Sequence, residues 1–111
     1  MFKLNEKDKE YRHGDYGPKY LEDGPRMSFG LLQILPGQSM EGHYHQKRQE
    51  VFYVVEGTLT ITVNGEDHIL EEGGYIHLEP GDTHMLRNDG DVNLKIVLAL
   101  APYEEGDKVL L

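Results

Sequence analysis

Residues 37–57 read Gly37-Gln-Ser-Met-Glu-Gly-His43-Tyr-His45-Gln-Lys-Arg-Gln-Glu50-Val-Phe-Tyr-Val-Val-Glu-Gly57. Side chains alternate between the two faces of a β-strand, so His43 and His45 can point into one interior. Glu50 opens the next apolar run and can approach the same point from a neighbouring strand. Two imidazoles and a carboxylate suit a first-row divalent metal better than a packed core. His84, which lies beyond a later turn, can complete the site.

The rest of the chain consists of short apolar runs separated by turn residues. In residues 58–63 the apolar Leu59, Ile61 and Val63 alternate with threonine, which is typical of a strand with one buried face. Asn64-Gly65 then predicts a tight hairpin. Further runs lie at residues 29–35, 51–55, 68–70, 75–78, 84–87 and 92–100. Regularly spaced short strands predict an all-β sandwich or barrel.

The two ends of the chain differ in character from its centre. Residues 1–26 are charged and rich in glycine and proline, and we expect an irregular arm of the same domain, with one short strand at 19–21. Residues 27–111 are then the barrel domain. The acidic run 104–107 is expected to be a solvated turn. The arm and the apolar residues 109–111 are suited to pairing with a partner subunit, so we expect a homodimer.

The spacing of the key residues resembles that of the cupin superfamily. The family's first motif is Gly, five residues, His-x-His, three or four residues, Glu, six residues and Gly, and this chain matches it at Gly37, His43, His45, Glu50 and Gly57. The second motif is Gly, five residues, Pro-x-Gly, two residues, His, three residues and Asn, matched at Gly73, Gly81, His84 and Asn88. Glu79 stands where the family usually has proline, and Pro80 follows at once.

The resemblance implies a fold and a metal site. The fold would be a small antiparallel β-barrel of the jelly-roll type, also called a double-stranded β-helix. The site would hold one divalent ion per chain, manganese, iron, nickel or zinc, through His43, His45, Glu50 and His84. Apolar residues of the runs beside these ligands are expected to line the pocket, namely Phe52, Val54, Ile76 and Leu86.

Composition limits the partners. The net charge is −9, with 11 basic and 20 acidic residues, which disfavours nucleic acid and anionic membranes. No apolar run approaches the roughly 18 residues of a membrane span, and a cytoplasmic location is the default expectation. The chain has no cysteine, which excludes disulfides and thiolate metal sites. A bound metal would be a local positive charge in this acidic chain, so we expect a small anionic ligand.

The reaction is left open by the sequence. A metalloenzyme acting on a small carboxylate, sugar or aromatic substrate, of the dioxygenase, decarboxylase or isomerase type, is one hypothesis. A metal-dependent ligand-binding protein without turnover is the alternative, and a purely structural barrel is a third. Cupins that degrade oxalate carry an arginine where this chain has Met40. Other anchors and acid–base groups are therefore candidates: Arg26, Arg48, Arg87, Tyr44, Tyr53, Tyr75 and Gln33.

Overall fold

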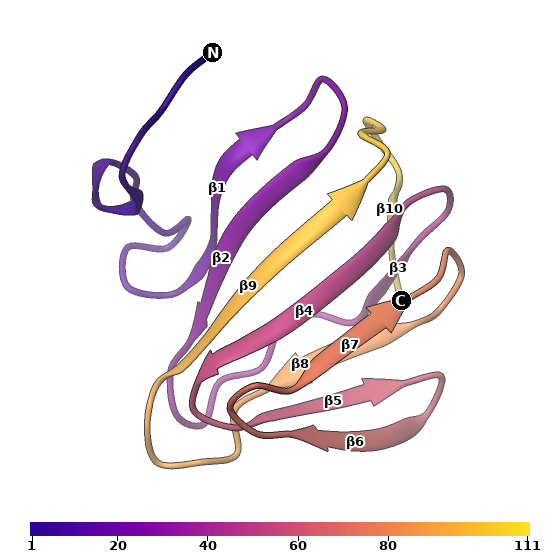
Figure 1. The fold of residues 1–111 in the computed structure, drawn as a ribbon. Helices are drawn as coiled ribbons and strands as arrows, with labels where there is room; N and C mark the ends of the chain where they lie inside the picture. Colours follow the sequence, from indigo (N-terminus) through magenta and orange to yellow (C-terminus); the bar gives the residue numbers. More distant parts are fainter.

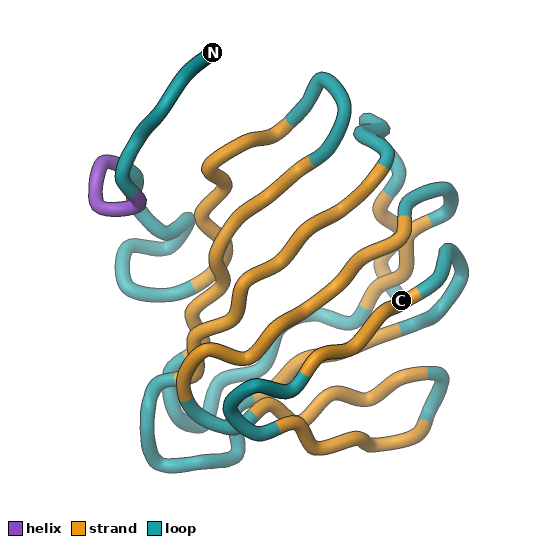
Figure 2. Tube along the Cα trace, in the orientation of Figure 1, coloured by secondary structure: helices purple, strands orange, loops and turns teal.

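The computed structural model describes residues 1–111 as two antiparallel sheets of five strands each (Figures 1 and 2). The first sheet has the strand order β1-β2-β9-β4-β7 and the second the order β10-β3-β8-β5-β6. This confirms the predicted all-β double-stranded β-helix. The strands are β1 (Gly17–Asp23), β2 (Ser28–Ile34), β3 (His43–His45), β4 (Gln49–Glu56), β5 (Leu59–Val63), β6 (Glu66–Leu70), β7 (Tyr75–Leu78), β8 (His84–Arg87), β9 (Leu94–Ala101) and β10 (Lys108–Leu110).

The core lies between the two sheets and follows from alternation within the strands. In β9 every second residue from Leu94 to Leu100 is buried, and in β5 both Leu59 and Ile61 are fully buried. These side chains belong to one cluster of 12 buried residues drawn from both sheets. Burying each such side chain contributes about 1.5–3 kcal/mol. The cluster therefore gives a rigid base against which polar residues can be held inside the barrel.

Two tight turns depend on positive φ angles. Asn64 and Gly65 have φ angles of 49° and 84°, which confirms the hairpin predicted between β5 and β6. Gly57 ends β4 with a φ angle of 85°, and a Cβ atom there would lie 2.7 Å from the carbonyl oxygen of Asn93. Only glycine fits at this position of the first motif.

The N-terminal arm contributes more regular structure than its sequence predicted. The expected strand at 19–21 is the centre of a longer edge strand, β1, which pairs with β2. The arm then folds back over β1, where Nζ of Lys19 lies 3.4 Å from a carboxylate oxygen of Glu6 and 4.3 Å from the centre of the Tyr11 ring. These contacts fix the backbone that carries Arg12 and Tyr20.

The C-terminal segment also joins the barrel. β10 pairs with β3 (Figure 1), and in that pair Lys108 lies directly opposite His45. Asp107, just before β10, is only 3% exposed. The prediction of a solvated turn at 104–107 was therefore wrong for Asp107, whose carboxylate is drawn inside by backbone and side-chain donors of residues 47 and 48.

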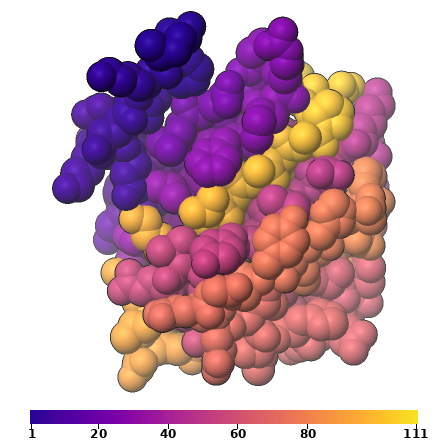
Figure 3. Space-filling model, in the orientation of Figure 1, coloured from indigo at the N-terminus to yellow at the C-terminus, as the bar shows by residue number.

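The outer face of the first sheet, which faces the viewer in Figure 3, carries exposed apolar side chains. Phe29, Tyr53, Val55 and Tyr75 are between 36% and 60% exposed, and Tyr53 and Tyr75 are cross-strand partners. The homodimer expected from the sequence stays a prediction, and this face is where its contact would be expected. No helix in the structure has the length and hydrophobicity that crossing a membrane requires.

Candidate metal centre

The four predicted ligands meet inside one end of the barrel. His43 and His45 project from β3 on the same face, as their spacing predicted, and His84 is the cross-strand partner of His43 on β8. Glu50 is not on an adjacent strand of the same sheet. It comes from β4 in the first sheet and faces the three imidazoles of the second. Both sheets must therefore pack correctly before the site exists.

The donor atoms are close enough to share one ion. One nitrogen or oxygen atom from each of the four side chains lies within 4.8 Å of the others. Oε1 of Glu50 lies 3.2 Å from Nε2 of His45 and 3.1 Å from Nε2 of His84. His45, Glu50 and His84 are at most 5% exposed, and His43 is half-buried. Together these side chains can hold a metal ion.

Two of the three imidazoles, those of His43 and His84, are oriented by an oxygen acceptor on the far side of the ring. Nδ1 of His43 lies 3.0 Å from the carbonyl oxygen of Glu41, and Nδ1 of His84 lies 3.0 Å from that of Asp82. A carbonyl oxygen can only accept, so both rings carry their proton on Nδ1 and direct the lone pair of Nε2 inward. Outer acceptors of this kind are typical of metal-binding histidines.

This orientation creates a demand for positive charge at the centre. In the neutral ring of His84, the Nε2 lone pair faces Oε1 of Glu50 at 3.1 Å. Two lone pairs at that separation repel each other unless a cation, either a proton or a metal ion, lies between them. Nitrogen and carboxylate donors are those that first-row divalent metals prefer. The residues present therefore fit the ion that the sequence predicted.

At neutral pH two of the candidate ligands are in the protonation state that metal binding requires. Burial lowers the pKa of His43 from 6.5 to about 4, so its ring is neutral. Burial alone would raise the pKa of Glu50, but the adjacent imidazoles of His45 and His84 outweigh that effect and lower the pKa to about 2. Glu50 is therefore ionised.

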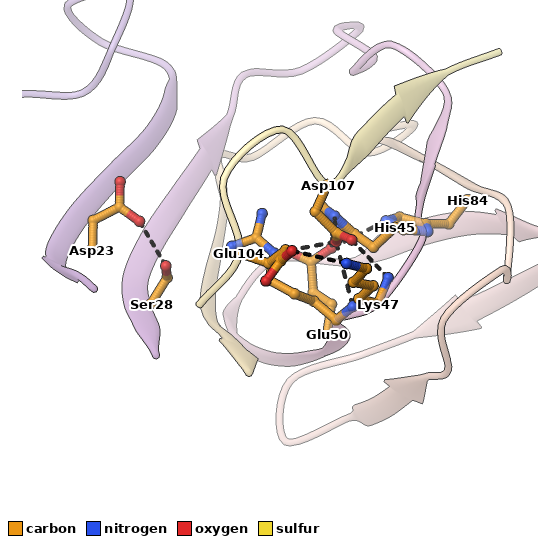
Figure 4. Close-up of polar contacts among 9 residues, drawn as sticks. Asp23, Ser28, His45, Lys47, Glu50, His84, Glu104 and Asp107 are labelled. Atoms are coloured by element: carbon orange, nitrogen blue, oxygen red, sulfur yellow. Dashed lines mark hydrogen bonds and ion pairs between the residues drawn. The ribbon is translucent and has the colours of Figure 1, made fainter. Parts of the chain in front are cut away.

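Asp107 connects the metal centre to the C-terminal segment (Figure 4). Its Oδ2 lies 3.2 Å from Nδ1 of His45, in a contact that is not aligned as a hydrogen bond. The same carboxylate accepts from the backbone N–H of Lys47 at 2.6 Å and from Nε of Arg48 at 3.3 Å. These donors outweigh burial and lower the pKa of Asp107, so it is ionised. Asp107 therefore supports His45 from behind.

A cavity of about 250 Å³ opens onto the candidate ligands. His43, His45 and Glu50 line it, and the buried His84 lies behind them. Of the apolar residues expected there, Phe52 and Leu86 line the cavity whereas Val54 and Ile76 do not. The other lining residues are Arg12, Pro18, Tyr20, Asp23, Leu32, Met40, Arg48, Leu98 and Lys108.

Several polar candidates from the sequence lie elsewhere. Tyr53 and Tyr75 are on the outer face of the first sheet, and Gln33 donates to the backbone of Asp15. Arg87 forms ion pairs on the second sheet with Asp67 and Asp89. Tyr44 and Arg26 are not among the lining residues, so only Arg48 of the proposed anchors reaches the cavity.

Tyr20 is a cavity residue that sequence reasoning missed. Its hydroxyl has no hydrogen-bond partner in the protein, and its ring lines the cavity. Burial, followed by the negative charge of Glu50, raises the pKa of Tyr20, so its hydroxyl stays protonated. The signal that could have found it is the alternation of Pro18 and Tyr20 along β1, which the nearby glycines obscured.

The chain belongs to the cupin family. The family model described as the cupin domain matches residues 30–100, more than half of the chain. In sequence the chain is 33% identical over 73 residues to the tetracenomycin polyketide synthase protein TcmJ of Streptomyces glaucescens, covering 66% of this chain and 49% of that protein. It is 32% identical over 91 residues to the mannose-1-phosphate guanylyltransferase ManC of Salmonella typhimurium, covering 81% of this chain and 19% of that protein.

A solved structure agrees on the fold. A double-stranded β-helix protein from Klebsiella pneumoniae superimposes with a TM-score of 0.84 and 20% identity, covering 99% of this chain and 96% of that one. The chain spans about half or less of the length of the two curated relatives above. What those proteins do as wholes is therefore not carried over with the shared domain.

Proposed function

We propose that this protein is a metal-dependent enzyme of the cupin type, with His43, His45, Glu50 and His84 holding one divalent ion. The observation that carries the proposal is the convergence of donor atoms from three imidazoles and one ionised carboxylate, all within 4.8 Å of one another, beside a cavity that His43, His45 and Glu50 line. Manganese, iron, nickel and zinc are the candidate ions. The substrate class is a small carboxylate, sugar or aromatic molecule, and the reaction an oxidation, decarboxylation or isomerisation.

The chain's own residues would bind the substrate and position a proton. A divalent ion at this site would polarise a carbonyl or hydroxyl oxygen of a bound molecule. Phe52 and Leu86 would exclude water from one side of that molecule. The protonated hydroxyl of Tyr20, which is free of protein partners, would donate a hydrogen bond to it and is the candidate proton donor.

The relatives support a domain that handles small molecules without choosing the reaction. One is named a polyketide synthase protein and the other a mannose-1-phosphate guanylyltransferase. A metal-dependent binding protein without turnover is the second candidate function. It is favoured by the scarcity of acid–base groups in the cavity apart from the ligands, where Tyr20 is the chief one.

Turnover can be tested with readouts that separate the reaction types. Protein loaded with each of the four metals would be incubated with panels of hydroxy acids, keto acids, sugars and phenols. Oxygen uptake reports oxidation, and carbon dioxide release reports decarboxylation. Isomerisation is reported by the loss of substrate C–H proton signals through exchange in deuterated water. We expect one of these signals, and we expect it to be abolished in His84→Ala and reduced in Tyr20→Phe.

The matched control is His68→Ala, because His68 is exposed on β6 and outside the cavity. That variant should keep full activity. Metal-dependent binding of a panel member with no signal in any of the three assays would favour the binding protein over the enzyme.

A further inference from the structure

Basic side chains are concentrated around the cavity, although the chain as a whole is acidic. Three of its 11 lysines and arginines, Arg12, Arg48 and Lys108, line one cavity of about 250 Å³ in a protein of net charge −9. They come from three separate segments: the N-terminal arm, the loop between β3 and β4, and β10. Asp23 and Glu50 are the carboxylates in the same lining. Of these, Asp23 accepts from the hydroxyl of Ser28 and Glu50 faces the imidazoles.

Two of the three cations have no protein partner. Nε of Arg48 donates to the buried carboxylate of Asp107, which partly neutralises it. By contrast, the side chains of Arg12 and Lys108 form no ion pair or hydrogen bond within the protein, although both line the cavity. Unpaired cations beside a partly enclosed cavity attract anions more strongly than those on an open surface.

Both unpaired cations are carried on well-defined backbone. The N–H of Arg12 donates to the carbonyl oxygen of Pro18 at 2.9 Å, which ties the arm to the start of β1. Lys108 lies opposite His45 in the β3–β10 pair.

We infer that Arg12 and Lys108 form an oxyanion subsite, and that the ligand is a small acid carrying a carboxylate or phosphate group as well as oxygen atoms that reach the four-ligand cluster. This rests on the proposed metal-centred function and narrows its substrate class. Neutral sugars and neutral aromatics would leave both cations unpaired and are excluded as preferred ligands. Arg12 also gives the N-terminal arm a role in selectivity.

Three polyols of equal carbon number test the inference: glucitol, gluconate and glucitol 6-phosphate. Their binding to the full chain loaded with manganese would be measured by calorimetry. At least one of the acids should bind more tightly than glucitol. Arg12→Gln and Lys108→Gln should each weaken binding of that acid about three- to tenfold, the value of one partly exposed charged contact. The ratio of the dissociation constants of gluconate and glucitol 6-phosphate shows whether the subsite prefers a carboxylate or a phosphate.

Arg26→Gln is the matched control, because Arg26 is exposed and does not line the cavity. It should leave binding of the acids unchanged. The inference is overturned if glucitol binds as tightly as both acids, if neither acid binds at millimolar concentration, or if Arg26→Gln weakens binding as much as Arg12→Gln.

Metal content of every sample separates this inference from the proposed function. A wild-type protein that retains no metal contradicts the proposed function. Acid binding by that metal-free protein, if reduced by Arg12→Gln, still supports the oxyanion subsite. Retained metal with no preference for the acids leaves the proposed function standing and overturns the subsite.

Discussion

Replacing Asp107 with asparagine should weaken both metal binding and the fold. Oδ2 of the carboxylate accepts from the backbone N–H and from Nε of Arg48 at 3.3 Å each, and Nδ1 of His45 lies 3.2 Å from it without forming an aligned hydrogen bond. An amide presents one oxygen and one NH₂ group. If the amide oxygen faces the backbone N–H of Lys47, which donates at 2.6 Å in the wild type, the NH₂ group opposes the two donors of Arg48. The reverse orientation opposes NH₂ to Lys47.

Either orientation leaves a buried donor without an acceptor, at a cost of about 1–3 kcal/mol for each such group. We therefore expect Asp107→Asn to lower the free energy of unfolding by about 2–4 kcal/mol. Loss of an outer carboxylate behind a ligand histidine typically reduces metal affinity by about 10–100-fold. Urea unfolding of the metal-free protein measures the first effect, and competition with a chromophoric chelator measures the second.

Glu104→Gln is the control for this prediction. Glu104 lies in the same C-terminal segment and pairs with Nζ of Lys47 at 3.1 Å, but both side chains are exposed. Its loss should change stability by less than about 1 kcal/mol and leave metal affinity unchanged. Equal effects of the two substitutions, or none from Asp107→Asn, would refute the assignment of Asp107 as the support of His45.

Asn88→Ala should lower the free energy of unfolding by about 1–3 kcal/mol in urea titrations, because the buried carbonyl oxygen of Ile34 loses its partner, as do the part-buried carbonyl oxygen of Val92 and N–H of Gly90. In metal-free protein, keeping His43 neutral contributes about 1–2 kcal/mol to the free energy of unfolding after allowance for solvent screening. Urea titrations at a series of pH values should show this contribution in full above pH 6.5 and show it lost as the pH falls from 6.5 towards 4. Thermal scans should show that added metal raises the unfolding midpoint at neutral pH and that this rise disappears below about pH 5, where protons displace the metal from the histidines. The rise should shrink in His84→Ala and persist in His68→Ala. Equal rises in both variants would place the metal elsewhere. Light scattering should give a mass of about twice 12.7 kDa, that of a homodimer. We expect its interface to be the apolar outer face of the first sheet, with the N-terminal arm taking part. A mass near 12.7 kDa at micromolar concentration would count against the homodimer.

The central part of the fold could be predicted because local rules determine it. Alternation placed His43 and His45 on one face, and the Asn64-Gly65 pair determined a hairpin whose φ angles are both positive. The bounds of β7 and β8 also agree with the apolar runs at 75–78 and 84–87. These features depend on neighbours in the sequence, so a single chain is enough to reveal them.

Contacts between distant segments could not be predicted in the same way. Residues 108–110 are too few to show alternation, so β10 and the burial of Asp107 depend on pairing with β3, more than sixty residues earlier. The glycines and prolines of the arm obscured the strand that carries Tyr20. Glu50 reaches the histidines across the barrel because of the order of the strands in the two sheets. The alternation of side chains along a single strand does not specify that order.

The central claim is that His43, His45, Glu50 and His84 bind one divalent metal ion per chain. The most direct test is elemental analysis of untagged protein after incubation with manganese, iron, nickel or zinc and removal of free metal. We predict close to one ion per chain in the wild type and in His68→Ala, and a marked loss in His84→Ala. Retention of none of the four metals by the wild type, or equal retention by His84→Ala, would contradict the account.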